Sequence, residues 1–198
     1  MRVALVGQDL AEVEELLPAR GLERDDISPE VVVSIGGDGT LLWAERDYPG
    51  VPKLPMRASE TSRKTHNHRF EELLDKLAAD TLVEIPQMKL VAESGGRKLY
   101  ALNDIIFHNA AVTSAVRYRV EINGRLYSDE IIGDGLIVAT PFGSTAYYRS
   151  ITHSLFEVGI GLAFNNTIEP VDHLVLRDCA VIRVTVLRGP ALVAADND

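Results

Sequence analysis

The fold is decided by a ten-residue stretch, VVVSIGGDGT at residues 31–40. Its first half, Val31 to Ile35, is a continuous run rich in β-branched residues, which is typical of a strand covered on both faces. Its second half, Gly36 to Thr40, leads into a helix predicted from about Leu41 to Glu45. Three glycines let a ligand approach the backbone closely, and the helix start offers unpaired N–H groups to an anion. The stretch therefore predicts a phosphate-binding loop between a buried strand and a helix.

Further strand and helix patterns alternate on both sides of this stretch. Residues 3–6 predict a strand, and residues 10–17 and 69–79 predict amphipathic helices. This alternation is the signature of an open, parallel α/β sheet. From about Leu82 the apolar runs become short and strand-like, so we predict an α/β domain at 1–83 and a β-rich, β-sandwich-like domain at 84–198.

Within the second half, residues 116–122 alternate between apolar and polar side chains, and Asn123-Gly124 is a strong two-residue hairpin signal. A further strand is predicted at 181–187. Residues 151–164 are interpreted as the one helix of this half. The acidic end at 196–198 is expected to be a frayed terminus.

Composition narrows the possible functions. The chain has 198 residues, with 20 basic and 29 acidic side chains and a net charge of −9, which argues against nucleic acid as a partner. It has no apolar stretch long enough to span a bilayer, and its start runs directly into a strand pattern rather than a signal peptide. With a single cysteine, Cys179, the chain is expected to be cytoplasmic and without a membrane partner.

Asp38 is the unusual member of the glycine loop. The loop lacks the Gly-Lys-Ser/Thr of a Walker A motif and does not match the dinucleotide fingerprint Gly-x-Gly-x-x-Gly. A carboxylate beside bound phosphates is repelled unless it holds magnesium or accepts a proton from an attacking hydroxyl. The alternative is that Asp38 only caps the helix. The strand-loop-helix context favours a catalytic role.

Two further segments are candidates for binding. Residues 133–148 place an apolar strand between two glycine loops, and the second loop is rich in hydroxyls that can bind ribose and phosphate oxygens. Asn103-Asp104 interrupts the apolar run 99–107, and a bound sugar would satisfy both side chains. A strand end or a β-bulge explains this pair equally well.

Together and in this order, the three motifs resemble those of the NAD kinase family, which phosphorylates the adenosine ribose 2'-hydroxyl of NAD. The match runs from Val31 to about Asn166, and DGLIVATPFGSTAY at 134–147 is its most specific part. The resemblance implies that Asp38 is the general base. It also implies a set of nucleotide-binding residues: Gly37, Gly39, Thr40, Asn103, Asp104, Asp134, Thr145, Ala146, Tyr147 and Ser150.

The resemblance further implies ATP or polyphosphate as phosphoryl donor, and magnesium that is not held in a fixed site of protein ligands. It also implies a homodimer or homotetramer. Family members are usually longer at the C-terminus, so partner subunits are expected to cover part of the α/β half. Residues 54–64 differ from the family's glycine-rich loop, and Arg57, Arg63 and Lys64 are candidates to neutralise phosphates there unless this is only a surface loop.

Two alternatives remain open. The first is a catalytically reduced NAD- or nucleotide-binding protein of the same fold, which the altered loop at 54–64 supports. The second is a lipid kinase of the diacylglycerol or sphingosine type. The latter kinases share the Gly-Gly-Asp-Gly-Thr loop, but the segment 140–147 argues against them.

Overall fold

The computed structural model describes residues 1–8, 10–57 and 69–196, which form two compact units, Met1–Pro86 and Gln87–Asp198. The elements of the first unit are β1 (Arg2–Gly7), α1 (Leu10–Leu16), the 3-10 turn η1 (Pro18–Arg20), β2 (Glu23–Arg24), β3 (Val31–Gly36), α2 (Asp38–Asp47), β4 (Lys53–Arg57) and α3 (Phe70–Ala78). Within the described ranges no helix is both long enough and apolar enough to cross a bilayer. Residues 58–64 of the altered loop, with Arg63 and Lys64, lie outside the described residues.

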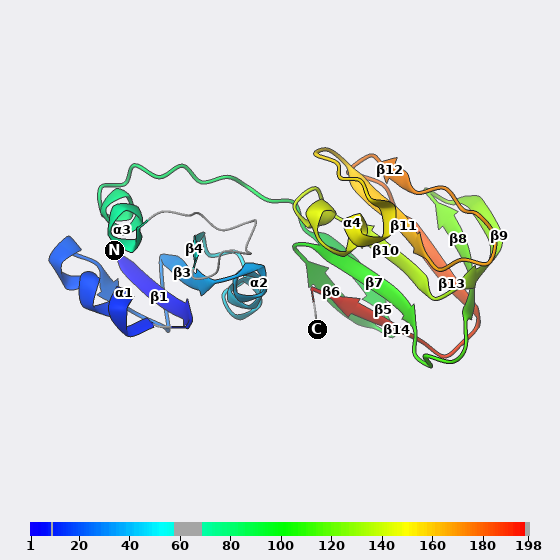
Figure 1. The fold of residues 1–198 in the computed structure, drawn as a ribbon, viewed down its shortest axis with the longest axis horizontal. Coiled ribbons are helices and arrows are strands. Elements are labelled where there is room, and N and C mark those ends of the chain that lie inside the picture. Colours follow the sequence, from blue (N-terminus) through cyan, green and yellow to red (C-terminus); the bar gives the residue numbers. More distant parts are fainter. Residues whose placement is uncertain (9, 58–68, 197–198) are drawn as a thin grey trace. The chain divides into compact units, whose positions relative to one another are not determined.

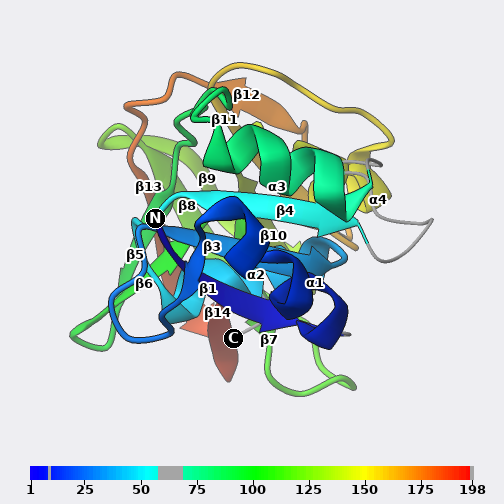
Figure 2. The same cartoon turned by 90° about the vertical axis from the view of Figure 1, so that its left-hand side faces the viewer.

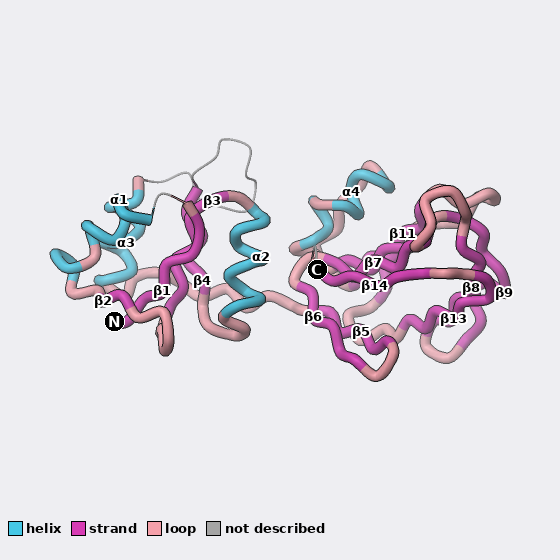
Figure 3. Tube along the Cα trace, turned by 90° about the horizontal axis from the view of Figure 1, so that it is seen from below, coloured by secondary structure: helices cyan, strands magenta, loops and turns pink. Residues whose placement is uncertain are grey.

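The first unit is a parallel sheet of order β2-β1-β3-β4 with helices on both faces. Alternate residues of β1 point to opposite layers. Val3 and Leu5 pack with α1 and α3, whereas Ala4 and Val6 pack with Ala44 of α2. Figure 2 shows α1 and α3 in front of the strands, and Figure 3 shows α2 on the other side of the sheet. Because both faces are covered, β3 needs the continuous apolar run that the sequence contains.

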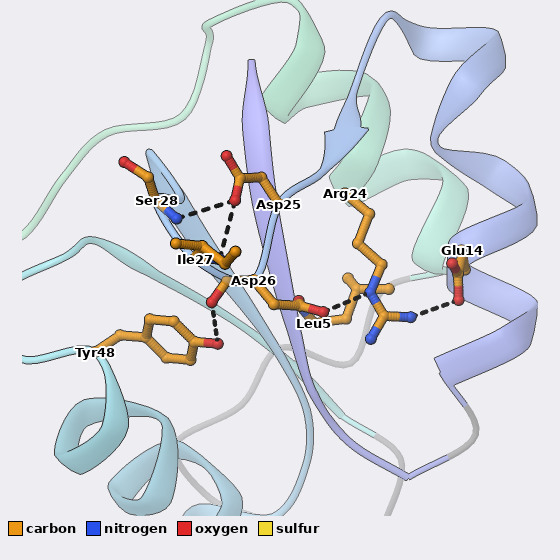
Figure 4. Close-up of polar contacts among 8 residues, drawn as sticks. All are labelled: Leu5, Glu14, Arg24, Asp25, Asp26, Ile27, Ser28 and Tyr48. Carbon is orange, nitrogen blue, oxygen red and sulfur yellow. Dashed lines mark hydrogen bonds and ion pairs between the residues drawn. The ribbon is translucent and has the colours of Figure 1, made fainter.

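A polar network holds the turn after β2 against the edge of this sheet (Figure 4). The Asp26 carboxylate accepts the backbone N–H of Leu5 at 3.3 Å and the Arg24 guanidinium at 2.9 Å. Arg24 also donates to Glu14 of α1 at 2.6 Å, and the Tyr48 hydroxyl donates to the Asp26 carbonyl at 3.0 Å. A side chain thus replaces the strand partner that β1 lacks beyond the short β2.

The second unit is built almost entirely of strands. Its elements are β5 (Leu90–Ser94), β6 (Arg97–Ala101), β7 (Asp104–Asn109), β8 (Val116–Ile122), β9 (Arg125–Gly133), β10 (Gly135–Ala139), the 3-10 turn η2 (Gly143–Thr145), α4 (Tyr147–Thr152), β11 (Ile160–Asn165), β12 (Leu174–Leu176), β13 (Ile182–Arg188) and β14 (Ala191–Ala195). They form sheets of order β12-β11-β10-β7-β14 and β13-β8-β9, with a β5-β6 hairpin. The β-sandwich-like arrangement confirms the predicted fold class.

The core of the second unit lies between its two larger sheets. Phe107, Leu136 and Phe164 of the five-stranded sheet pack with Tyr118 and Ile131 of the three-stranded sheet. Tyr118 is fully buried, and its hydroxyl donates to the Gly135 carbonyl at 2.9 Å. This bond ties the core to the start of β10. On the other face of the sheet, α4 lies over β10 and β11 (Figure 1).

The interpretation of residues 151–164 as a helix is wrong. The helix of this region is α4, which ends at Thr152, and residues 160–165 form the strand β11 between β10 and β12. Residues 160–164 are all buried, because the strand is covered by the three-stranded sheet on one face and by α4 on the other. A doubly covered strand shows no alternation, so its periodicity does not separate it from a buried helix.

Candidate nucleotide-binding site

The glycine loop lies at the carboxyl edge of the parallel sheet. Strand β3 ends at Gly36, Gly37 is the N-cap of α2 with φ −103°, and Asp38 is the first helical residue. The helix therefore begins three residues before the predicted start at Leu41, and Gly37 rather than Asp38 holds the N-cap position. Carboxyl edges of parallel sheets are where open α/β folds bind ligands, and helix starts favour anions. The loop thus has the position of a phosphate-binding site.

The glycines of the loop differ in what their surroundings require. A Cβ at Gly36 would lie 2.3 Å from the Thr40 hydroxyl oxygen, so packing within the loop excludes a side chain there. A Cβ at Gly37 or Gly39 would meet no atom of the described residues within 4 Å. Packing therefore explains why position 36 is a glycine. Gly37 and Gly39 instead leave open space beside Asp38, and a ligand that approaches the backbone needs such space.

A cationic side chain ends the neighbouring strand. Arg57 is the last residue of β4, and the parallel register pairs it with Gly36 of β3. Arg57, a half-buried residue, therefore shares the sheet edge with the glycine loop. Of the three cationic candidates in the altered loop, Arg57 is the one within the described residues.

Asn103 and Asp104 lie where β6 turns into β7, so the strand-end interpretation of this pair describes the backbone correctly. Both residues are buried, with 7% and 5% of their surfaces exposed. The Asn103 carbonyl accepts the Thr140 N–H at 2.9 Å, and the Thr140 hydroxyl donates to the Leu102 carbonyl at 2.6 Å. The bend is thereby tied to the end of β10.

Gly143 packs directly on this bend. A Cβ at Gly143 would lie 2.0 Å from the Asn103 carbonyl oxygen, and the Gly143 N–H donates to the Thr140 hydroxyl at 2.9 Å. Glycine is required because two backbones meet here without room for a side chain. The structure therefore brings the Asn103-Asp104 pair and the loop around Gly143 together.

Asp134 occupies the opposite end of β10. Its carboxylate accepts the side-chain amide of Asn166 at 2.7 Å and that of Asn109 at 3.3 Å. Its backbone N–H donates to the Asn165 carbonyl at 3.0 Å, and its carbonyl accepts the Asn109 N–H at 2.8 Å. Asp134 is therefore held by asparagines at the ends of β7 and β11, and none of these asparagines was predicted as a site residue.

The segment 143–150 runs between the two ends of β10, from the Asn103-Asp104 bend toward Asp134. Thr145 is the last residue of η2, Ala146 precedes α4, and Tyr147 and Ser150 belong to α4. The Asn165 side-chain amide donates to the Tyr147 hydroxyl at 3.3 Å. Thr145, Ala146 and Tyr147 are half-buried, and Ser150 is exposed. The segment thus starts against Asn103 and reaches the asparagines beside Asp134.

A pocket of about 480 Å³ opens beside α4. Tyr147 and Ser150 line one side, and Asn165, Asn166 and the stretch 170–173 line the other. At its wall the His173 Nδ1 accepts the Phe164 N–H at 3.3 Å, which fixes the ring. The pocket combines hydroxyl, amide and aromatic groups, and it is large enough for one half of a dinucleotide.

The register of the strands shows how far apart the two ends lie. Ala139 of β10 pairs with Asp104 of β7, and Gly135 pairs with His108, four residues away. At about 3.4 Å per residue, the ends are roughly 14 Å apart. One small ligand cannot contact both, whereas an extended dinucleotide can.

Several residues that hold this candidate site together had weak or no sequence signals. Asn165-Asn166 follows an apolar run and would have been noticed had residues 160–164 been recognised as a strand. Asn109 had no distinguishing pattern, and Thr140 was noted only as part of the segment 134–147, without a role of its own. The frayed terminus predicted at Asp196 is wrong, because the Asp196 carboxylate accepts backbone N–H groups of Asn103 and Asp104 at 2.7 and 3.2 Å.

The first unit has the fold and loop of a phosphate-binding α/β domain, and the second has a polar pocket on a β-sandwich. These features place the chain in the class of nucleotide-binding proteins.

No family model matches the sequence. The NAD kinase of Lactobacillus johnsonii is 29% identical over 215 residues, covering the whole chain and 76% of the relative. The NAD kinase of Limosilactobacillus reuteri is 32% identical over 184 residues, covering 82% of the chain and 67% of the relative.

Solved structures show the same fold. An Archaeoglobus fulgidus NAD kinase in complex with ATP matches the whole chain and 84% of its own with a TM-score of 0.84 at 24% identity. Yeast NADH kinase complexed with NADH matches the whole chain and 73% of its own with a TM-score of 0.82 at 16% identity. By its similarity to the curated relatives, the chain belongs to the NAD kinase family.

Proposed function

We propose that the chain transfers a phosphoryl group from ATP or polyphosphate to the adenosine ribose 2'-hydroxyl of NAD, giving NADP. The observation that carries this proposal is the junction of β3 and α2, where Asp38 stands between two glycines that face open space. The family assignment makes the chain an NAD kinase. That one neighbour binds ATP and another NADH supports nucleotides as both phosphoryl donor and acceptor.

Asp38 is proposed as the general base. Its carboxylate accepts the proton of the ribose 2'-hydroxyl as that oxygen bonds to the terminal phosphorus of the donor. The bond from this phosphorus to the bridging oxygen breaks, and ADP or the shortened polyphosphate leaves with the electron pair. Phosphoryl transfer depends mainly on positioning and charge neutralisation, so one well-placed carboxylate suffices. Gly37, Gly39 and Thr40 are proposed to line the phosphates at the start of α2.

In the second unit, NAD is proposed to lie along the segment 143–150. The buried Asn103-Asp104 pair would bind the ribose at one end of β10, and Asp134 would bind the other half of the dinucleotide at the opposite end. Thr145, Ala146, Tyr147 and Ser150 would line the path between them. The separation of roughly 14 Å between the ends of β10 is too long for one small ligand to contact both ends, and it fits an extended dinucleotide.

Magnesium is proposed to bind mainly through substrate phosphates. Within the described residues no three His, Cys, Asp or Glu side chains gather to hold a metal ion. Mg²⁺ keeps several waters and is commonly bound by one or two carboxylates together with substrate phosphates, so its binding does not require such a cluster. Asp38 is the carboxylate at the glycine loop that could contribute such a ligand. When bound, the ion neutralises the negative charge of the phosphates. The chain itself, with a net charge of −9, supplies little positive charge for this.

A cytoplasmic setting and a homodimer or homotetramer complete the proposal. The single Cys179, which allows no disulfide within the chain, supports the cytoplasmic setting. Exposed apolar side chains on the second unit, such as Val91 and Tyr100, which pair across the β5-β6 hairpin, support the homo-oligomer.

The test is an incubation of purified protein with Mg²⁺, NAD and either ATP or polyphosphate, with NADP measured by an NADP-specific dehydrogenase. Calorimetric NAD binding is measured in parallel, and NADH replaces NAD in one arm. NADP formation supports the proposal and identifies the phosphoryl donor. NAD binding without NADP would identify a catalytically reduced binding protein, and phosphorylation of a lipid without NAD binding would identify a lipid kinase.

A further inference from the structure

Asp196 lies directly after β14, which pairs antiparallel with β7. Its carboxylate accepts three consecutive backbone N–H groups, those of Leu102, Asn103 and Asp104, and the last two bonds measure 2.7 and 3.2 Å. The Asp196 N–H returns a bond to the Asp104 carbonyl at 3.2 Å. One side chain near the end of the sequence therefore holds a bend more than ninety residues away.

We infer that Asp196 is a positioning residue for NAD binding, which fixes the backbone of the Asn103-Asp104 pair in its binding conformation. The inference rests on the proposed function, because it assumes that this pair contacts NAD. The three donors belong to residues that are each at least 93% buried, so water cannot replace the carboxylate without opening the bend. Hydrogen bonds to an ionised acceptor are also shorter and stronger than neutral ones.

Asp196 acts together with Thr140 on the other side of the bend. Thr140 binds the carbonyls of Leu102 and Asn103 through its hydroxyl and its backbone N–H, while Asp196 binds the N–H groups. The backbone N–H and the backbone carbonyl of Asn103 are thus each held by a residue that follows a different strand. A side chain that only ended β14 would bond within the β14-β7 ladder, whereas the Asp196 carboxylate contacts the bend between β6 and β7.

The informative variant is Asp196→Asn. Asp196 has a left-handed φ of 49°, which asparagine also adopts readily, so the backbone is preserved. The amide keeps one oxygen for Asn103 and Asp104 but presents an NH₂ group to the Leu102 N–H, where it cannot accept a hydrogen bond. The matched control is Asp80→Asn, which makes the same change at an exposed residue of the first unit with φ 52°.

The test measures amide hydrogen exchange, NAD binding and steady-state kinetics. In the wild type we expect slow exchange at residues 102–104. In Asp196→Asn we expect exchange there at least tenfold faster and both Kd and KM for NAD raised at least tenfold, with KM for the phosphoryl donor within twofold of wild type. Asp80→Asn should match the wild type in every measurement.

The outcomes separate the two claims. Rapid exchange at 102–104 in the wild type overturns the inference without any variant, so it stays testable even if Asp196→Asn does not fold. A wild type that binds NAD together with an Asp196→Asn variant of unchanged Kd overturns the inference alone. An equal rise in KM for both substrates also overturns it, since that indicates general damage. A wild type that binds no NAD overturns the proposed function, and this inference with it.

Discussion

Gly39→Ala should separate stability from activity in the first unit. Gly39 is the second residue of α2, and a Cβ there meets no described atom within 4 Å. Replacing a helical glycine by alanine stabilises a helix by about 0.5–1 kcal/mol because the unfolded chain loses conformational freedom. For a unit of this size, that corresponds to a rise in Tm of roughly 2–8 °C.

The same methyl group should lower activity. If phosphates approach the backbone at Gly39, the added carbon occupies the space that they need, and we expect kcat/KM to fall at least tenfold, equivalent to about 1.4 kcal/mol of transition-state stabilisation. The assay pairs thermal unfolding with NADP formation. The control is Asp47→Ala at the other end of α2, which also removes an unfavourable residue from the helix but leaves the loop unchanged.

A Gly39→Ala variant that melts at a lower temperature than the wild type would show that the space beside Gly39 is not open. A variant with wild-type kcat/KM would show that this space does not serve the substrate. Asp47→Ala should gain stability with unchanged kinetics. A loss of activity in this control would show that helix stability, not access to the loop, governs turnover.

Three further predictions concern other parts of the chain. Asp38→Asn should lower kcat at least a hundredfold with NAD Kd within threefold of wild type, as loss of a general base does, and a wild-type kcat in steady-state assays would sink the assignment. Gly143→Ala should destabilise the second unit by about 1–3 kcal/mol in denaturant unfolding and raise KM for NAD, because its Cβ would lie 2.0 Å from the Asn103 carbonyl oxygen; unchanged stability contradicts this. The N–H groups of Ser28 and Ile27 hold the pKa of the Asp25 carboxyl below its ordinary value of 3.8, so its contribution to stability is present above that pH and lost as the pH falls through the lowered pKa. The stability difference between wild type and Asp25→Asn should therefore shrink on acidification below about pH 4 in pH-dependent unfolding, and a constant difference would show that the carboxylate contributes nothing.

The sequence predicted those parts of the fold that local patterns determine. The continuous run at 31–35 is β3, and Asn123-Gly124 joins β8 to β9 with positive φ at both residues. The strand β11 was missed because its residues are buried on both faces, which removes the alternation that marks most strands. The start of α2 was placed too late because Gly37 caps the helix without a polar side chain, so no cap residue marks the boundary.

For the candidate site, sequence motifs located the loops but not the residues that support them. The glycine loop and the segment 140–147 could be recognised because several unusual residues stand together in the chain. Asn109, Asn166 and Asp196 could not be found in this way, because each reaches the site only when separate strands pair. Their roles depend on the antiparallel register of β10 with β7 and β11 and of β7 with β14, which no local pattern specifies.

The proposed reaction is tested most directly by its product. Wild type and Asp38→Asn are each incubated with Mg²⁺, NAD and either ATP or polyphosphate, and phosphorus NMR identifies the product. We predict a new monophosphate ester on the adenosine ribose 2'-oxygen with the wild type, and at least a hundredfold slower appearance of the same product with Asp38→Asn. No phosphorylated NAD from the wild type, or a phosphate on another hydroxyl, would contradict the proposed reaction. Equal rates from the two proteins would contradict the role of Asp38.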